Sequence, residues 1–413
     1  MILKFYSLFI HLYGLLIRIA AFKLPQAKLW VKGREEWRTR YAAVLKDNQH
    51  AIWIHCASLG EFEQGRPLIE KIRSEFPDKK IVLSFFSPSG YEIRKDYNQV
   101  DAVIYLPLDT FRNANDFIEL LNPSLALFVK YEFWFNYLSV LHQKQIPVVY
   151  FSTIFRANHF LLKWPGNSLL PLIARCHNIF VQDEDSLNRL VAVGLNNVSQ
   201  ASDTRFDRVW NTAMRAEDDS VIKEFTKNRK LLMLGSTWLP DIEALLEVLP
   251  TFDFKQWCIA IAPHHIDEVS LEELMCQLGL EEAKQYYTNF DRSKSTNILV
   301  INTMGRLSAL YKMADLVFVG GGFGKAVHNV LEPAVFAKPI VCGPRIQKFK
   351  EVLDLKNENG IVVIPETSDF KGAWNTLSQD ESLRKKMGET NFLYVKSRLG
   401  GADTIFNYLR TFF

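Results

Sequence analysis

Two hydrophobic periodicities alternate along most of the chain. From residue 51 onward, short apolar runs of strand length alternate with stretches whose apolar residues recur every three or four positions. This alternation is typical of parallel α/β layers. The strands expected in the first half are 51–57, 81–86, 102–106, 124–130, 147–152 and 178–182. The helices expected between them include 64–76, 89–97 and 111–121.

The alternation breaks in the polar stretch 200–220 and then resumes. The second series of expected strands is 230–237, 256–263, 298–303, 316–321, 338–344 and 360–365. A chain of 413 residues exceeds the usual size of one core. We therefore expect α/β domains at 41–210 and 211–395, with a final helix at 396–413 that packs back on the first domain. Such sheets bind ligands at the carboxyl ends of their strands, which predicts a cleft between the domains.

The first 22 residues differ from the rest because they are nearly all apolar. Their few polar or small positions recur at steps of three and four, which makes one narrow stripe along a helix. These positions are Lys4, Ser7, His11, Gly14 and Arg18. Basic residues follow at Lys23, Lys28, Lys32, Arg34, Arg38 and Arg40. Residues 1–40 therefore predict a helix in the membrane interface with a cationic flank on anionic headgroups. A spanning anchor and a helix buried against the first domain stay open as alternatives.

Composition excludes several classes of protein. Hydrophobic residues make up 48% of the chain and charged residues 23%, as in an ordinary globular protein. The net charge of +3 is too small to indicate a nucleic-acid partner. The five cysteines are scattered and form no CxxC pair, which suits a reducing cytosol and argues against disulfides and a zinc site.

A glycine-rich turn is the most informative chemical feature. In the segment 314–344 a strand runs into glycines 320–322, with a helix expected to start near His328. Glycines let the backbone approach an anion, and a helix N-terminus offers free N–H groups, so the turn predicts a phosphate site. Asn329 and Glu332 are expected on one side of that helix, where the carboxylate would bind a ribose diol. The spacing fits neither a Walker loop nor a dinucleotide fingerprint.

Other strand ends are expected to face the same cleft. They are GST at 235–237, APHH at 262–265 and the start of NTMGRL at 302–305. Adjacent histidines on a turn rarely bind one metal ion, and Asp183 of the DED run suits a helix cap. In the first half, Ser58 and Glu61 have the spacing of a capping box. A helix N-terminus also keeps a carboxylate such as Glu61 ionised and ready to accept a proton.

The motifs, taken in order, are HCASLGEFEQ, YEFWFN, TRFD, GSTW, APHH, NTMGRL, ADLVFVGG and HNVLEPAVFAKPIVCGP, after a hydrophobic amino terminus. This order resembles the 3-deoxy-D-manno-octulosonic acid (Kdo) transferases of lipopolysaccharide assembly. The resemblance implies the GT-B fold, with two Rossmann-like domains facing each other across a cleft. It implies inverting transfer of Kdo from CMP-Kdo to a lipid A precursor (lipid IVA), without metal or cofactor, at the cytoplasmic face of the inner membrane.

The resemblance also implies roles for individual residues. Glu61 is expected to be the general base, and Glu132 and Arg205 are expected to stabilise the transition state. The residues expected to bind CMP are His264, His265, Met304, Gly305, Arg306, Asn329, Val330, Leu331 and Glu332. The residues expected to contact the acceptor are Arg66, Ser87, Ser89, Gly90, Arg94, Lys130 and Arg156. Lys130 and Arg306 depart from the family pattern, since each replaces a carboxylate.

Two rival interpretations remain. One is another GT-B transferase, or an epimerase, that uses a UDP-sugar. The other is a non-catalytic membrane-surface protein that binds anionic lipid through its basic amino-terminal region. Cytidine nucleotide binding would distinguish the Kdo transferase from both.

Overall fold

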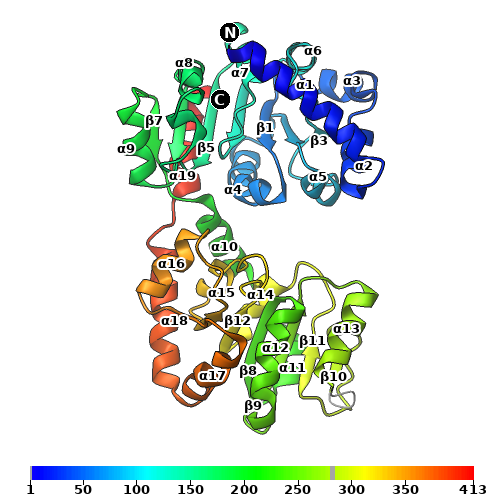
Figure 1. Ribbon diagram of the computed structural model, residues 1–413, viewed down its shortest axis with the longest axis vertical. Coiled ribbons are helices and arrows are strands. Elements are labelled where there is room, and N and C mark those ends of the chain that lie inside the picture. The colour runs from blue at the N-terminus through cyan, green and yellow to red at the C-terminus, as the bar shows by residue number, and fades with distance from the viewer. Residues whose placement is uncertain (1, 280–283) are drawn as a thin grey trace. The chain divides into compact units, whose positions relative to one another are not determined.

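The computed structural model describes residues 2–279 and 284–413 and divides into two α/β units (Figure 1). Unit 1 comprises Met1–Arg208 and Gly400–Phe413, and unit 2 comprises Val209–Leu399. The sequence pattern predicts these divisions at 210/211 and 395/396. In the structure the first division falls inside one helix, α10 (Thr204–Arg215), which occupies the polar stretch expected to break the pattern.

Unit 1 contains a parallel seven-stranded sheet in the order β3-β2-β1-β4-β5-β6-β7. Its strands are β1 (Ile52–Cys56), β2 (Ile81–Phe85), β3 (Ala102–Tyr105), β4 (Leu125–Val129), β5 (Val148–Thr153), β6 (Asn178–Val181) and β7 (Val198–Gln200). Its helices are α1 (Ile2–Ala20), α2 (Pro25–Lys32), α3 (Trp37–Asp47), α4 (Leu59–Glu75), α5 (Pro88–Arg94), α6 (Phe111–Leu121), α7 (Phe135–Gln143), α8 (Leu170–Ile173), α9 (Glu184–Ala192) and α19 (Gly401–Leu409). The strand order reverses between β1 and β4, and such a switch point is where α/β sheets bind ligands.

Unit 2 repeats this design with the order β10-β11-β9-β8-β12-β13-β14. Its strands are β8 (Lys230–Thr237), β9 (Trp257–Pro263), β10 (Lys284–Tyr286), β11 (Ile298–Val300), β12 (Leu316–Val319), β13 (Ile340–Cys342) and β14 (Ile361–Val363). Its helices, after α10, are α11 (Ser220–Thr226), α12 (Leu239–Val248), α13 (Glu268–Leu278), α14 (Leu307–Leu310), α15 (Leu331–Ala334), α16 (Lys350–Asn357), α17 (Phe370–Gln379) and α18 (Glu381–Lys396). The switch point of this sheet lies between β8 and β12.

Each face of the first sheet is covered by helices. One core joins Trp53 of β1 to Phe117 of α6 and Tyr137 of α7, all fully buried. The other joins Ile54 to Phe62 of α4 and to Ile405 of α19. The strands are therefore buried on both sides, which explains their continuous apolar runs. The edge strands β7 and β10 are not predicted by the pattern, because their sequences, VSQ and KQY, contain no apolar run, whereas the equally short edge strand β14 reads IVV.

The helix α1 (dark blue in Figure 1) packs on unit 1 through one face. The Tyr6 hydroxyl donates to Oδ2 of Asp109 over 2.6 Å, and a Cβ at Gly14 would lie 2.5 Å from Leu108 Cδ2. Ser7 donates to Asn136 Oδ1 over 3.1 Å. Ser7 and Gly14 of the predicted polar stripe therefore face protein rather than water. The opposite face is apolar and 51–67% exposed, at Phe5, Leu8, Phe9, Leu12, Leu15, Leu16 and Ile19.

Candidate functional site

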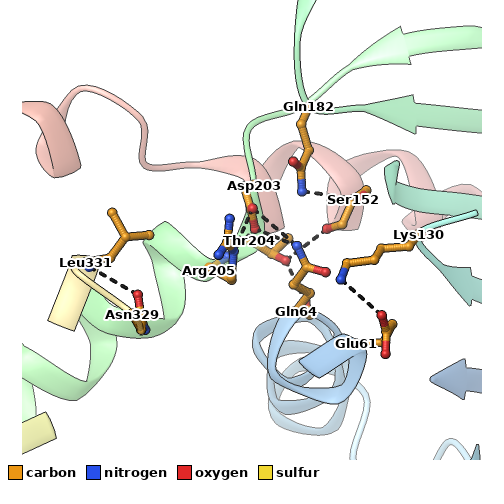
Figure 2. Close-up of polar contacts among 10 residues, drawn as sticks. All are labelled: Glu61, Gln64, Lys130, Ser152, Gln182, Asp203, Thr204, Arg205, Asn329 and Leu331. Atoms are coloured by element: carbon orange, nitrogen blue, oxygen red, sulfur yellow. Dashed lines mark hydrogen bonds and ion pairs between the residues drawn. The ribbon is translucent and has the colours of Figure 1, made fainter. Parts of the chain in front are cut away.

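The first group of site residues lies at the carboxyl ends of β1 and β4, at the switch point of unit 1. Glu61 stands in the first turn of α4, and Lys130 directly follows β4. Nζ of Lys130 lies 3.0 Å from Oε1 of Glu61, and the Ser58 hydroxyl donates to Oε2 (Figure 2 draws the lysine contact). Ser58 occupies the N-cap position but makes no side-chain bond to the helix backbone. The predicted capping box is therefore wrong, because the hydroxyl binds the carboxylate instead.

The pKa values of two nearby carboxyl groups, Glu61 and Glu132, are shifted in opposite directions. Burial alone would raise the pKa of Glu61, but the charge of Lys130 and the Ser58 hydrogen bond outweigh it and hold the pKa below its ordinary value. Burial, with the charge of Glu61, raises the pKa of Glu132 to about 7 against the opposing effect of Lys130. Environments that separate two carboxyl pKa values in this way suit acid–base chemistry.

Arg205 belongs to the same unit and is held by a buried carboxylate. Its Nε donates to Oδ2 of Asp203 over 2.8 Å, and Asp203 is only 5% exposed. Nε2 of Gln64 donates to both oxygens of Asp203, over 3.1 and 3.2 Å. Thr204 then donates to the Gln64 carbonyl over 2.6 Å, so that this network joins α10 to α4 (Figure 2). The sequence pattern does not reveal Asp203 and Gln64, because their contact spans 139 residues.

Three of the residues with a left-handed backbone lie at the carboxyl ends of strands in the two sheets. Lys130 has φ +61°, Ser152 in β5 has φ +56°, and Ser236 in β8 has φ +55°. Residues other than glycine rarely adopt this region, and such strain clusters at functional sites. The backbone N–H of Lys130 donates to the Phe151 carbonyl over 2.8 Å, which fixes the residue in this conformation.

The residues expected to contact the acceptor lie in different environments. Ser87 caps α5 by accepting the N–H of Ser89 over 3.2 Å. A Cβ at Gly90 would lie 2.2 Å from the Phe85 ring, so packing explains this glycine. Two of the basic residues are already paired: Arg66 with Glu70 at 2.7 Å, and Arg94 with Glu63 at 3.0 Å. Arg156 is exposed.

The second group lies in unit 2, at the ends of β8 and β12. The N–H of Gly321 donates to Oδ2 of Asp241 over 2.8 Å, and Asp241 is fully buried in α12. A Cβ at Gly322 would lie 2.6 Å from the Gly343 nitrogen. The glycines thus permit two loops to pack closely, and one N–H expected for a phosphate is used by a carboxylate. The helix expected from His328 begins only at Leu331.

Aromatic rings form a stack beside this loop. The His264 ring stacks on both Trp238 and His328, with centroid distances of 4.5 and 4.7 Å. Nε1 of Trp238 donates to Nε2 of His328 over 3.0 Å. Burial, with the nearby His264, lowers the pKa of His328 to about 4, so that the ring is neutral at physiological pH. His265 meets the edge of Trp238 at 4.9 Å. Trp238 and His328 were not among the expected site residues, although both lie inside quoted motifs.

Asn329 and Glu332 are brought together, but not along one helix. Asn329 precedes α15 and accepts the Leu331 N–H on Oδ1 over 3.1 Å (Figure 2). Its Nδ2 donates to Oε1 of Glu332 over 3.2 Å. The predicted placement of both residues on one helix is therefore wrong, because the helix is only four residues long. Val330 and Leu331 are buried, so any contact they make with a nucleotide would come from their backbone.

The segment around Gly305 is exposed. Gly305 has φ +80°, which suits glycine, and Met304 is 70% exposed. Nη2 of Arg306 lies 2.7 Å from Oδ2 of Asp219 and 3.0 Å from the Tyr287 hydroxyl. The positive charge of Arg306 is thus offset by Asp219 on the same unit.

Acidic and histidine clusters offer little to a metal ion. Among residues 2–279 and 284–413, no group of three or more His, Cys, Asp or Glu side chains is arranged to hold one. Asp183 accepts the N–H of Ser186 over 2.7 Å and caps α9, as expected for the DED run.

Known proteins resemble this chain through both units. Residues 35–208 match the family model of 3-deoxy-D-manno-octulosonic-acid transferases. A bifunctional glycosyltransferase/methyltransferase of Fusobacterium nucleatum is 27% identical over 379 residues, which cover 86% of this chain but only 56% of that protein. The 3-deoxy-D-manno-octulosonic acid transferase of Haemophilus influenzae is 24% identical over 382 residues, which cover 87% of each chain.

Solved structures confirm the fold. The UDP-GlcNAc 2-epimerase of Neisseria meningitidis bound to UDP-GlcNAc aligns with a TM-score of 0.62 and 14% identity, covering 87% of this chain and 100% of that one. At this identity the likeness concerns the GT-B architecture alone. The amino-terminal unit thus matches a Kdo transferase domain, and Kdo transferases align with the chain through both units.

Proposed function

We propose that the protein transfers Kdo, with inversion, from CMP-Kdo to a lipid A precursor (lipid IVA). The matched family model and the similar Kdo transferases support the sugar, and one observation supports the chemistry. Glu61 is an ionised, half-buried carboxylate at the switch point of unit 1, in the position where the family resemblance implies a general base.

In the proposed step, an oxygen of Glu61 accepts the proton of the acceptor hydroxyl. The hydroxyl oxygen bonds to the anomeric carbon of Kdo while the bond from that carbon to the CMP phosphate breaks, and the phosphate keeps the electron pair. Attack opposite the leaving group inverts the anomeric centre. The products are the glycosylated lipid, CMP and a protonated Glu61, which returns its proton to water. Arg205, oriented by Asp203, would stabilise the negative charge that develops.

Unit 2 would hold the nucleotide. Asn329 and Glu332 present an amide and a carboxylate for phosphate and ribose, and the ring stack of Trp238, His264 and His328 supplies an aromatic wall. Glu132 has a pKa of about 7 and is therefore partly protonated at neutral pH. We further propose that this protonation reduces the repulsion between Glu132 and both Glu61 and the anionic substrates. No metal or cofactor is part of the proposal.

The membrane association of α1 is also a proposal. In the described part of the chain, α1 is the one helix long and apolar enough to cross a bilayer. Of its apolar 18-residue window, 11% is buried in the protein. Spanning would break the Tyr6–Asp109 hydrogen bond and the Gly14 contact, whereas lying in the interface keeps both and buries the exposed apolar face. We therefore favour a helix lying flat on the cytoplasmic face of the inner membrane, beside Lys23, Lys28 and Lys32.

The test is an incubation of the purified protein with CMP-Kdo and a tetra-acylated bisphosphorylated lipid A precursor, followed by product mass. Glu61→Gln is measured in parallel, with CMP binding as the control for folding. A general base contributes about 10²- to 10⁴-fold, so the variant should bind CMP normally and lose activity by that factor. Near-parent activity of the variant would refute the base role. A parent that transfers nothing but binds a uridine nucleotide would refute the proposed reaction.

A further inference from the structure

We propose that Lys130 is an exchangeable counter-ion of Glu61, which clamps the carboxylate in the free enzyme and moves to a phosphate of the acceptor when the acceptor binds. This inference rests on the proposed function and adds a regulatory step to the same site. Lys130 departs from the family pattern, so the device belongs to this chain rather than to the resemblance.

Both carboxylate oxygens of Glu61 accept a hydrogen bond. Oε1 receives the Lys130 ammonium at 3.0 Å, and Oε2 receives the Ser58 hydroxyl. A general base must direct a lone pair at the proton that it accepts. Each oxygen keeps a second lone pair, but the ammonium and the hydroxyl both stabilise the negative charge, so release of one partner makes Glu61 a stronger base toward an acceptor hydroxyl.

Lys130 is the partner that is able to move. Ser58 lies three residues from Glu61 in the same helical turn, so its hydroxyl stays close whatever binds. Lys130 comes from a different strand end and carries a flexible four-carbon stem. Its side chain is 30% exposed, against 14% for Glu61, so an anion from solvent would reach the ammonium first. Its backbone is held by the bond to Phe151, so only the side chain would swing.

The surrounding charges make the exchange consequential. Besides Lys130, the titratable groups on which the charge of Glu61 acts include Glu132, the His55 ring and the Cys56 thiol, and the charge of Glu63 acts on Cys56 as well. Burial lowers the pKa of His55 to about 3 and raises that of Cys56, so both are neutral. Glu63 is engaged by Arg94 and Arg208. The charge of Lys130 therefore lowers the pKa values of both Glu61 and Glu132.

A phosphate would compete well for this ammonium. It carries up to two negative charges where Glu61 carries one, and its oxygens accept strong charge-assisted hydrogen bonds. Once the ammonium has left, the pKa of Glu61 rises toward that of a buried carboxylate, and the group becomes a stronger base. Binding of the acceptor would thus activate the base that deprotonates it. Without acceptor, the clamped carboxylate would be a poor base toward water, which limits wasteful hydrolysis of CMP-Kdo to Kdo and CMP.

The experiment compares the parent with Lys130→Met and the matched control Lys144→Met, which removes an exposed lysine paired with Glu119 at 3.4 Å. We expect Lys130→Met to fold normally and to raise the acceptor KM tenfold or more. It should also reduce the preference for a bisphosphorylated over a monophosphorylated acceptor. The acidic limb of the pH profile for transfer should move up by about one pH unit. Hydrolysis of CMP-Kdo without acceptor, measured at pH 8.5, should rise several-fold. Lys144→Met should match the parent throughout.

Two outcomes would overturn the exchange. If the acidic limb moves but the acceptor KM stays, Lys130 is a fixed counter-ion; if KM rises but the limb and the hydrolysis rate stay, it is a phosphate ligand only. Failure of the parent to transfer Kdo is a separate result, because it refutes the proposed function. The exchange is then decided by titrating the ¹³C-labelled Glu61 carboxyl by NMR. A bisphosphorylated lipid A precursor should raise its pKa in the parent but not in Lys130→Met, and an unchanged parent value would refute the exchange.

Discussion

Nε of Arg205 lies 2.8 Å from Oδ2 of Asp203, and the same carboxylate receives the amide of Gln64, which stands three residues after Glu61 in α4. Asp203 therefore connects the helix that carries the proposed base to the residue proposed to stabilise the transition state. Because Asp203 is 5% exposed, these donors take the place of water as its hydrogen-bond partners. A buried carboxylate thus orients Arg205.

Asp203→Asn should uncouple Arg205 from this network. The amide keeps the volume but loses the charge that orients the guanidinium, and misplacement of a reacting partner by about 1 Å costs up to about 10²-fold in rate. We expect kcat for transfer to fall at least tenfold with unchanged CMP affinity, measured by kinetics and calorimetry. Asp185→Asn, which breaks an exposed pair with Arg189, is the control and should be neutral. A normal kcat for Asp203→Asn would show that Arg205 needs no such support.

Gly322→Ala should separate the two loops that meet in unit 2. A Cβ there would lie 2.6 Å from the backbone nitrogen of Gly343, and overpacking of this kind costs about 1–3 kcal/mol. Thermal stability and CMP affinity should fall together, the latter at least tenfold. Gly324→Ala is the matched control, since its Cβ would meet only the Gly321 carbonyl at 3.5 Å, and both properties should be retained. Equal effects of the two substitutions would contradict the packing role.

Tyr6→Phe should loosen α1 from unit 1. The substitution removes the hydroxyl that donates to Asp109 over 2.6 Å. Burial raises the pKa of Asp109 to about 7, so near neutral pH the bond contributes between the ~1 kcal/mol of a neutral pair and the ~1.5–3 kcal/mol of a charged one. Hydrogen exchange of the backbone amides of α1, measured in detergent, should become correspondingly faster. Tyr13→Phe keeps the ring that stacks on Phe86 and should leave protection unchanged. Protection of α1 that survives Tyr6→Phe would mean that apolar contacts alone hold the helix.

Unit 2 should lose stability in mild acid. Burial holds the pKa of His328 at about 4, whereas an unfolded histidine has a pKa of about 6.5. Between these values the unfolded chain binds more protons, so the free energy of unfolding falls as the pH drops from about 6.5 to about 4. The difference in Tm between pH 7 and pH 5 should shrink in His328→Gln, whose side-chain oxygen still accepts from Trp238 but does not titrate. An unchanged difference would exclude His328 as the source.

Among the described residues, local patterns predicted every strand except β7 and β10, which each lie at one edge of a sheet. The run 81–86 became β2 (Ile81–Phe85), because a strand buried on both faces must be continuously apolar. Strand β7 (Val198–Gln200) was not predicted, because its sequence VSQ contains no apolar run. The glycine turn was located correctly, but the use of one of its N–H groups by Asp241 was not predicted. Whether an N–H of Gly321 is free depends on Asp241, which reaches it from 80 residues away.

The sequence by itself determined the α/β class, the two series of strands, the apolar character of α1 and the position of Glu61 at the end of a strand. These are properties of neighbouring residues, and periodicity records them directly. Only the tertiary structure decided that Ser7 and Gly14 face the protein, that Asp203 orients Arg205 and that Lys130 clamps Glu61. Each of these depends on which strands and helices become neighbours. Lys130 and Glu61 are 69 residues apart and meet because β4 pairs with β1.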